Sequence, residues 1–229
     1  MQLLRAFGFL ITTMVMYLGI PLLGWGLGDL PGFFSSGPRL AYAMLVLALG
    51  LAVGWQALRS PQGIRGGKGR EEKRVSRQRV VRIAVILLLY AGLLFVPYAD
   101  RRDTGTLSAG PVVRWVGVVL FVLGMALVYW SGVALGRLYS GDVTLQESHR
   151  LVTVGPYRLI RHPRYAGGIL LGVGLSLLFD SWIGLLATAL FVAIILFRIK
   201  DEEALMSQAF GQQWGAYCAR THRLVPFVW

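Results

Sequence analysis

The sequence predicts an all-α, polytopic membrane protein: a helix bundle with four spanning helices and a C-terminal helical hairpin. Three observations predict this class. Hydrophobic residues make up 55% of the 229 residues and charged residues only 15%, which is too apolar for a soluble domain of this size. Several long apolar runs contain no charge. The positive charges gather in alternate loops, as they do in proteins that cross a bilayer.

Four apolar runs are expected to span the membrane. Residues 6–28, 40–58 and 115–136 are each long enough to cross roughly 30 Å of hydrocarbon. The run at 83–99 is shorter, but it can span if Arg82 extends toward the headgroups. A secretory signal is the alternative for the first run. That run, however, is longer than a signal core and is not followed by a small-residue cleavage site.

The distribution of charge predicts the orientation of the chain. The net charge is +12. Basic residues crowd the loop at 59–82, the loop around 100–103 is neutral, and the basic excess returns after residue 137. The positive-inside rule then places the N-terminus in the cytoplasm, with membrane lipids as partners of the basic loops. Nucleic-acid binding by the Arg/Gly stretch at 65–70 is the weaker alternative, and no nucleic-acid partner is expected.

Cysteine and histidine usage argues against a metal centre. The single cysteine, Cys218, excludes an internal disulfide and is expected to be a small helix residue rather than a nucleophile. The three histidines, His149, His162 and His222, are not spaced like a metal-binding helix pair. No metal site is therefore expected.

The chain is expected to divide into a transmembrane scaffold, residues 1–136, and a more polar and aromatic unit, residues 137–229. Within the second unit, Pro163 disfavours helix at the residue before it and suits the first turn of a helix. A membrane hairpin is therefore expected at about 163–179 and 183–200, and chemistry is expected in this second unit.

A C-terminal interfacial helix is expected after the hairpin. Residues 201–213 contain good helix formers and no proline, so the second hairpin helix should continue out of the bilayer. Phe210, Trp214 and Tyr217 would then fall on one helix face. The simplest role for this face is packing on the rest of the protein.

Two polar features could carry chemistry. The first is the segment from His149 to Tyr165, an irregular, cation-rich stretch that is tolerated at a membrane surface where it lines a water-accessible cavity. The N-terminus of the helix at Pro163 would favour a carboxylate or phosphate there. The alternative is a loop that contacts lipid headgroups.

The second feature is the pair Arg198 and Glu202, which are four residues apart and so share one helix face. Ionisable residues at this depth are candidates for function, although the ends of membrane helices also carry ordinary anchoring charges. Glu203 lies about 100° further round the helix. It is expected to be the solvated one of the two glutamates.

These residues resemble a known family. The segment HRLVTVGPYRLIRHPRYAG at 149–167, RIKDEE at 198–203, Phe210-Gly211 and RLVP at 223–226 together resemble the isoprenylcysteine carboxyl methyltransferases and the related phospholipid methyltransferases. The motifs occur in order and with compatible spacing. The first 110 residues match that family only in being apolar and helical.

The resemblance implies an integral membrane methyltransferase with S-adenosyl-L-methionine as cofactor, bound at the cytoplasmic side. Arg198 would face the methyl acceptor and Glu202 would contact the cofactor, and these two are the implied catalytic residues. Arg150 and Arg164 would contribute mainly through their backbone. The implied cofactor-binding residues are His149, Arg150, Leu151, Val152, Tyr157, His162, Pro163, Arg164, Tyr165 and Glu202.

The resemblance also implies a lipophilic methyl acceptor that enters from the bilayer, with a carboxylate of the isoprenylcysteine type as the leading candidate. A phospholipid amine or a thiol is an alternative acceptor. An NADPH-dependent reductase of the sterol type is another possibility, although the further motifs of such enzymes are not found here. A non-catalytic membrane protein is the last alternative, and the oligomeric state is left open.

Overall fold

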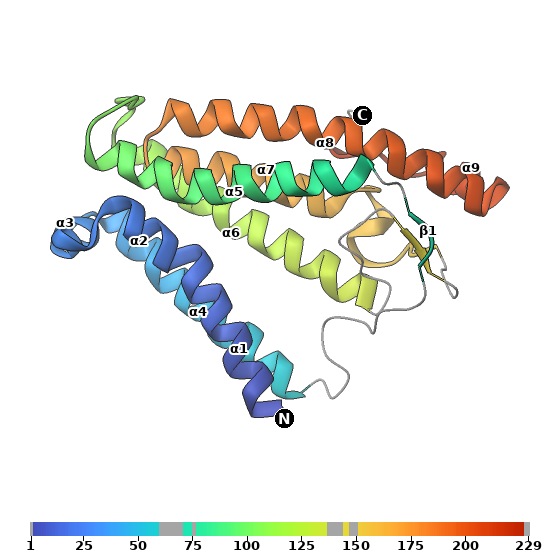
Figure 1. Cartoon of the computed structure of the whole chain (residues 1–229), viewed down its shortest axis with the longest axis horizontal. Helices are drawn as coiled ribbons and strands as arrows, with labels where there is room; N and C mark the ends of the chain where they lie inside the picture. Colours follow the sequence, from blue (N-terminus) through green and yellow to red (C-terminus); the bar gives the residue numbers. More distant parts are fainter. Residues whose placement is uncertain (1, 60–70, 75–76, 137–143, 147–150, 227–229) are drawn as a thin grey trace. The chain divides into compact units, whose positions relative to one another are not determined.

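The computed structural model describes residues 2–59, 71–74, 77–136, 144–146 and 151–226. Residues 60–70 of the basic loop, together with His149 and Arg150, lie outside the described residues. Helices dominate the fold, which confirms the all-α membrane bundle (Figure 1). The described α-helices are α1 (Gln2–Met14), α2 (Ile20–Trp25), α3 (Leu30–Phe34), α4 (Gly37–Arg59), α5 (Arg77–Arg101), α6 (Gly110–Leu135), α7 (Pro163–Leu178), α8 (Trp182–Phe210) and α9 (Gln212–Cys218).

Shorter elements connect these helices. A π-helical turn at Val15–Gly19 joins α1 to α2, and 3-10 turns occupy Leu27–Asp29 and Gly155–Arg158. Two short strands, β1 (Glu71–Arg74) and β2 (Thr144–Gln146), pair in antiparallel fashion. The sequence did not predict this small sheet, because β1 is wholly polar and charged and shows no apolar alternation.

Within the described residues, five segments are long and apolar enough to cross a membrane. Four of them correspond to the predicted spans, and the run expected at 83–99 is longer than predicted, since Arg82 lies inside its helix. The fifth is α8, while α7 is apolar but shorter. The five segments are Ala6–Trp25, Gly37–Leu58, Val80–Arg101, Gly110–Leu135 and Trp182–Phe210.

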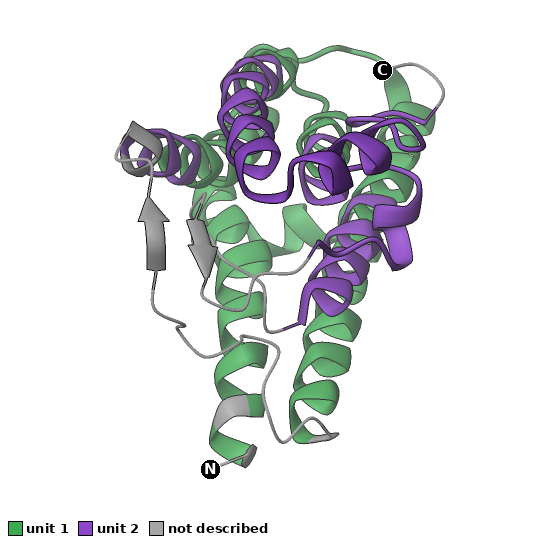
Figure 2. Cartoon of the chain, turned by 90° about the vertical axis from the view of Figure 1, so that its right-hand side faces the viewer, with its two compact units in different colours: residues 1–63, 87–122, 170–188 green, residues 64–86, 123–169, 189–229 purple. Residues whose placement is uncertain are grey.

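The chain forms two compact units, each assembled from segments far apart in the sequence (Figure 2). Unit 1 comprises residues 1–63, 87–122 and 170–188. Unit 2 comprises residues 64–86, 123–169 and 189–229, and it contains every predicted site residue. Each of α5, α6, α7 and α8 contributes residues to both units.

Unit 1 contains a buried cluster of charged side chains. The Asp100 carboxylate, whose side chain is 2% exposed, accepts hydrogen bonds from Arg39 Nη1 at 3.0 Å and from Arg114 Nη2 at 2.6 Å. Arg114 also lies 3.5 Å from Asp180 and donates to the carbonyl of Leu178. Because buried charges are tolerated only when they are paired, this cluster ties α4, α5, α6 and the end of α7 together.

The predicted hairpin of α7 and α8 is present. Its turn is closed by Ser181, whose Oγ accepts a hydrogen bond from the N–H of Gly184 at 3.2 Å and so caps α8. In unit 1, Gly174 of α7 and Gly117 of α6 lie so close together that a Cβ on either would collide with the other helix. Such close approach through small residues is how membrane helices pack without a hydrophobic driving force.

The C-terminal helices agree with the prediction in part. α8 continues past the membrane hairpin as one helix of 29 residues to Phe210, as the good helix formers after residue 201 predicted. Gly211 then takes a φ of 48°, a conformation that favours glycine, and breaks the helix before α9. The prediction that Phe210, Trp214 and Tyr217 share one helix face was therefore wrong. Only the last two share a helix, with ring centroids 5.6 Å apart and both side chains buried.

Candidate active site

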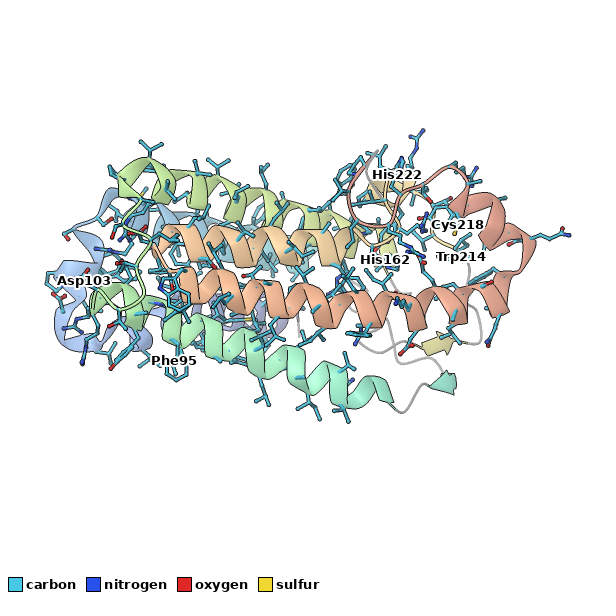
Figure 3. The ribbon with its side chains drawn as sticks, turned by 90° about the horizontal axis from the view of Figure 1, so that it is seen from above. Phe95, Asp103, His162, Trp214, Cys218 and His222 are labelled. Atoms are coloured by element: carbon cyan, nitrogen blue, oxygen red, sulfur yellow. The ribbon has the colours of Figure 1, made fainter. Side chains whose placement is uncertain are left out.

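The candidate site rests on two backbone segments of unit 2, one just before α7 and the other after α9. The N–H groups of Arg161 and His162 donate to the carbonyls of His222 and Arg223 at 2.7 and 3.0 Å. The N–H of His222 donates in return to the carbonyl of Leu159 at 3.0 Å. Figure 3 shows His162 and His222 in the same region of this unit. These bonds satisfy the polar backbone of an irregular segment and fix the start of α7.

α7 begins at Pro163, as the sequence predicts. The carbonyl of His162 accepts hydrogen bonds from the N–H groups of Tyr165 and Ala166, both at 3.1 Å, and so closes the first turn. The rings of His162 and Tyr165 are stacked, with centroids 5.7 Å apart and planes at 19°. The start of the helix therefore places two predicted cofactor-binding side chains together.

The hydroxyl of Tyr165 connects the two predicted catalytic residues. Arg198 Nε donates to this hydroxyl at 2.6 Å, and the hydroxyl donates to Glu202 Oε2 at 2.8 Å. Arg198 and Glu202 lie one turn apart on α8, which lets both reach the same atom of α7. Arg198 is 8% exposed, whereas the side chain of Glu202 is 29% exposed. The structure thus joins a buried cation to a partly accessible carboxylate through one phenol.

An apolar cluster lies next to this chain of hydrogen bonds. Ile195, Ile199 and Leu224 are buried together, and Tyr165 and Phe191 pack against them. An apolar neighbourhood lowers the local dielectric and strengthens each hydrogen bond beside it. The polar chain of Arg198, Tyr165 and Glu202 is therefore held firmly.

Glu203 was expected to be solvated, and that expectation was wrong. Its side chain is only 13% exposed, less than half the exposed fraction of Glu202. It accepts hydrogen bonds from Arg161 Nε at 2.9 Å and Arg223 Nε at 3.0 Å, and His162 Nε2 lies 3.3 Å from Oε1. Helical spacing could not reveal this, because all three partners belong to the two segments outside the helix. The signal in the sequence was an excess of arginines in those segments with few acids to pair them.

The remaining cofactor-binding candidates have varied surroundings. Pro163 is buried, and Leu151, Val152 and Arg164 are half-buried. Tyr157 is 8% exposed, and its carbonyl accepts a hydrogen bond from the hydroxyl of Tyr217 at 2.8 Å. His149 and Arg150 are not among the described residues.

Burial raises the pKa of two ionisable groups near the site. Burial raises the pKa of the Tyr217 hydroxyl to about 12, so it stays a hydrogen-bond donor at neutral pH. Burial also raises the pKa of the Cys218 thiol, which makes it a poor nucleophile. In the part of the chain that is described, no group of three or more His, Cys, Asp or Glu residues is placed to hold a metal ion.

This fold and this site define an integral membrane protein whose polar centre is built where the hairpin meets the C-terminal segment. Residues 112–213 match the family model of the phospholipid methyltransferases, which confirms the resemblance noted from the sequence. The solved structure of the eukaryotic intramembrane Ras methyltransferase ICMT (isoprenylcysteine carboxyl methyltransferase) has the same fold. That match has a TM-score of 0.55 and 21% identity, and covers 96% of this chain and 74% of that one.

Two plant proteins are similar in sequence. One, from Oryza sativa subsp. indica, is named probable protein-S-isoprenylcysteine O-methyltransferase and is 29% identical over 119 residues, 51% of this chain and 62% of the relative. The other, protein-S-isoprenylcysteine O-methyltransferase B of Arabidopsis thaliana, is 33% identical over 115 residues, 49% of this chain and 58% of the relative. The chain thus spans about three fifths of the length of these relatives.

Proposed function

We propose that this protein transfers a methyl group from S-adenosyl-L-methionine to a lipophilic acceptor. The observation that carries the proposal is the hydrogen-bond chain from Arg198 through Tyr165 to Glu202. It sets a cation suited to an anionic acceptor beside a carboxylate suited to a cationic cofactor. The methyltransferase names of the similar proteins support the same conclusion.

The residues present fit this cofactor. Glu202 offers a negative charge, and the stacked rings of His162 and Tyr165 offer aromatic faces, both of which stabilise a sulfonium cation. When bound, S-adenosylmethionine supplies an electrophilic methyl group. Glu203 Oε1 lies 3.3 Å from His162 Nε2 and fixes the orientation of that ring. The apolar cluster of Ile195, Ile199 and Leu224 keeps water from the reacting groups.

The leading acceptor is a carboxylate of the isoprenylcysteine type. A carboxylate is already a nucleophile at neutral pH, so the protein need only place its oxygen in line with the methyl group, and positioning supplies most of the rate. Arg198 would orient the carboxylate by charge-assisted hydrogen bonds. The acceptor would enter from the bilayer, while the charged cofactor would come from the cytoplasm, where we also place the N-terminus.

A phospholipid amine is the second candidate acceptor, because the matching family model is that of the phospholipid methyltransferases. An amine or a thiol must lose a proton as it is methylated. Glu202 is the group placed to accept that proton, since its carboxylate is partly exposed and lies within the hydrogen-bond chain.

The test is to incubate purified protein with methyl-labelled S-adenosylmethionine and one acceptor at a time. The acceptors are N-acetyl-S-farnesylcysteine, phosphatidylethanolamine and a small thiol, and mass spectrometry identifies the methylated product. We expect a methyl ester of the farnesylcysteine. Calorimetric titrations with S-adenosylmethionine and NADPH run in parallel. Binding of NADPH alone would indicate a reductase, and binding of neither, without product, would indicate a non-catalytic protein.

A further inference from the structure

A polar pocket lies in unit 2, apart from the candidate site. Its volume is about 260 Å³, and it shares no lining residue with the chain of Arg198, Tyr165 and Glu202. Pockets for drug-sized ligands usually measure roughly 300–1,000 Å³, so this one suits a small group rather than a whole nucleoside cofactor. Its lining residues are Thr153, Arg158, Tyr217, Arg220 and Thr221.

The walls of this pocket are rigid, because two turns far apart in the sequence are bonded to each other. The 3-10 turn at Gly155–Arg158 presents Arg158, and the turn after α9 presents Arg220. Tyr217 bridges them, since its hydroxyl donates to the carbonyl of Tyr157 at 2.8 Å, and Thr221 Oγ1 donates to the carbonyl of Tyr217 at 2.7 Å. Both arginines are thus brought to one pocket.

The pocket is cationic. No carboxylate is among its lining residues. Arg161 and Arg223 nearby both form ion pairs with Glu203, whereas within the described residues neither Arg158 nor Arg220 has an ion pair or a hydrogen bond through its side chain. Two exposed guanidinium groups and the hydroxyl of Thr153 therefore remain as donors. Paired guanidinium groups match the geometry of a tetrahedral oxyanion.

The surroundings indicate where such an anion would come from. Val154 and Leu159, which follow the lining residues Thr153 and Arg158 directly in sequence, are 58% and 56% exposed. Exposed aliphatic side chains next to arginines are typical of a surface at the level of the lipid headgroups. Such a surface attracts anionic lipids, because the guanidinium groups pair with phosphate while the apolar side chains enter the acyl region.

We propose that the pocket between Arg158 and Arg220 binds a phosphate group, supplied by the headgroup of a phospholipid or by free phosphate. This site is independent of methyl transfer. It gives unit 2 a fixed anchor point for an anion at the membrane surface.

The experiment titrates detergent-solubilised protein with two probes, dihexanoyl phosphatidylglycerol and inorganic phosphate, and follows binding by ³¹P NMR. We expect saturable binding of the lipid that weakens by about tenfold or more in Arg158→Ala and in Arg220→Ala, and is lost in the double variant. Lys200→Ala removes one exposed positive charge from the same unit outside the pocket, and should bind like wild type. Thermal melting of every variant checks that it is folded.

The two probes distinguish the two sources. Binding of the lipid alone identifies a headgroup site, and binding of both probes with the same dependence on Arg158 and Arg220 identifies a general phosphate site. The proposal is overturned if neither probe saturates, or if the folded double variant binds as tightly as Lys200→Ala. Arg158→Lys with Arg220→Lys keeps the charge but loses the paired geometry. If this lysine double variant binds only weakly, the result supports a need for the guanidinium groups themselves and not only for their charge.

Discussion

The hydroxyl of Tyr165 donates a hydrogen bond to Glu202 Oε2 at 2.8 Å, and this bond links the start of α7 to the C-terminal third of α8. Because Arg198 donates to the same hydroxyl, the phenol sets the distance between the guanidinium and the carboxylate. An acceptor held by one and a cofactor held by the other would therefore be positioned relative to each other by Tyr165.

Tyr165→Phe removes this link while leaving the stacked ring beside His162. We expect kcat/KM for methyl transfer to fall about ten- to a hundredfold, because hydrogen bonds to charged groups contribute about 1.5–3 kcal/mol. The binding of S-adenosylmethionine, measured by calorimetry, should change less. Tyr129→Phe, a change to an exposed tyrosine elsewhere in unit 2, is the control. Equal activity of the two variants would contradict a role for the hydroxyl.

Arg198→Ala and Glu202→Ala should each abolish methyl transfer and leave the protein folded in detergent. The reason is that each removes one of the two charged groups that we assign to acceptor and cofactor. Product formation measured by mass spectrometry and a melting curve test both parts. Lys200→Ala, an exposed neighbour on the same helix, should keep full activity. Wild-type turnover in the Arg198 and Glu202 variants would remove these residues from the site.

Glu203→Gln should reduce stability more than Glu202→Gln does. The Glu203 carboxylate forms ion pairs with two guanidinium groups, whereas Glu202 is more exposed and bonded to a neutral hydroxyl. We expect a loss of about 2 kcal/mol, the scale of a hydrogen bond to a charged group. A thermal-shift assay in the same detergent compares the two variants. If Glu203→Gln melts at the same temperature as Glu202→Gln or at a higher one, the prediction is wrong.

Asp100→Asn should destabilise unit 1 strongly. The carboxylate is the shared partner of Arg39 and Arg114, and its loss leaves the buried Arg39 without this carboxylate and Arg114 with Asp180 alone. Breaking a buried pair in this way costs about 3–5 kcal/mol. Asp103→Asn is a suitable control, since Asp103 is exposed and its φ of 49° is readily adopted by asparagine. If Asp100→Asn and Asp103→Asn both have the melting temperature of the wild type, the cluster does not stabilise the bundle.

Much of the fold follows from local sequence. Apolar length predicts the four scaffold spans, and Pro163 predicts the first residue of α7, because proline is favoured in the first turn of a helix. The pairing of Arg198 with Glu202 on one face follows from helical spacing. These features depend on residues within a few positions of each other.

What the sequence could not predict depends on contacts between distant segments. The ion pairing of Glu203 requires Arg161 and Arg223, which come from two separate stretches outside α8. The break at Gly211 was missed because a single glycine within good helix formers is compatible with a continuous helix, and only its φ decides the matter. His149 and Arg150 remain predictions.

The backbone bonds that fix the start of α7 also fix the order in which the protein can form. The N–H groups of Arg161 and His162 find their acceptors only at His222 and Arg223, about sixty residues later in the chain. Contacts so distant in sequence form slowly, after local helices. During synthesis on the ribosome, the membrane helices can therefore assemble first, and the candidate site closes only once the segment after α9 has emerged.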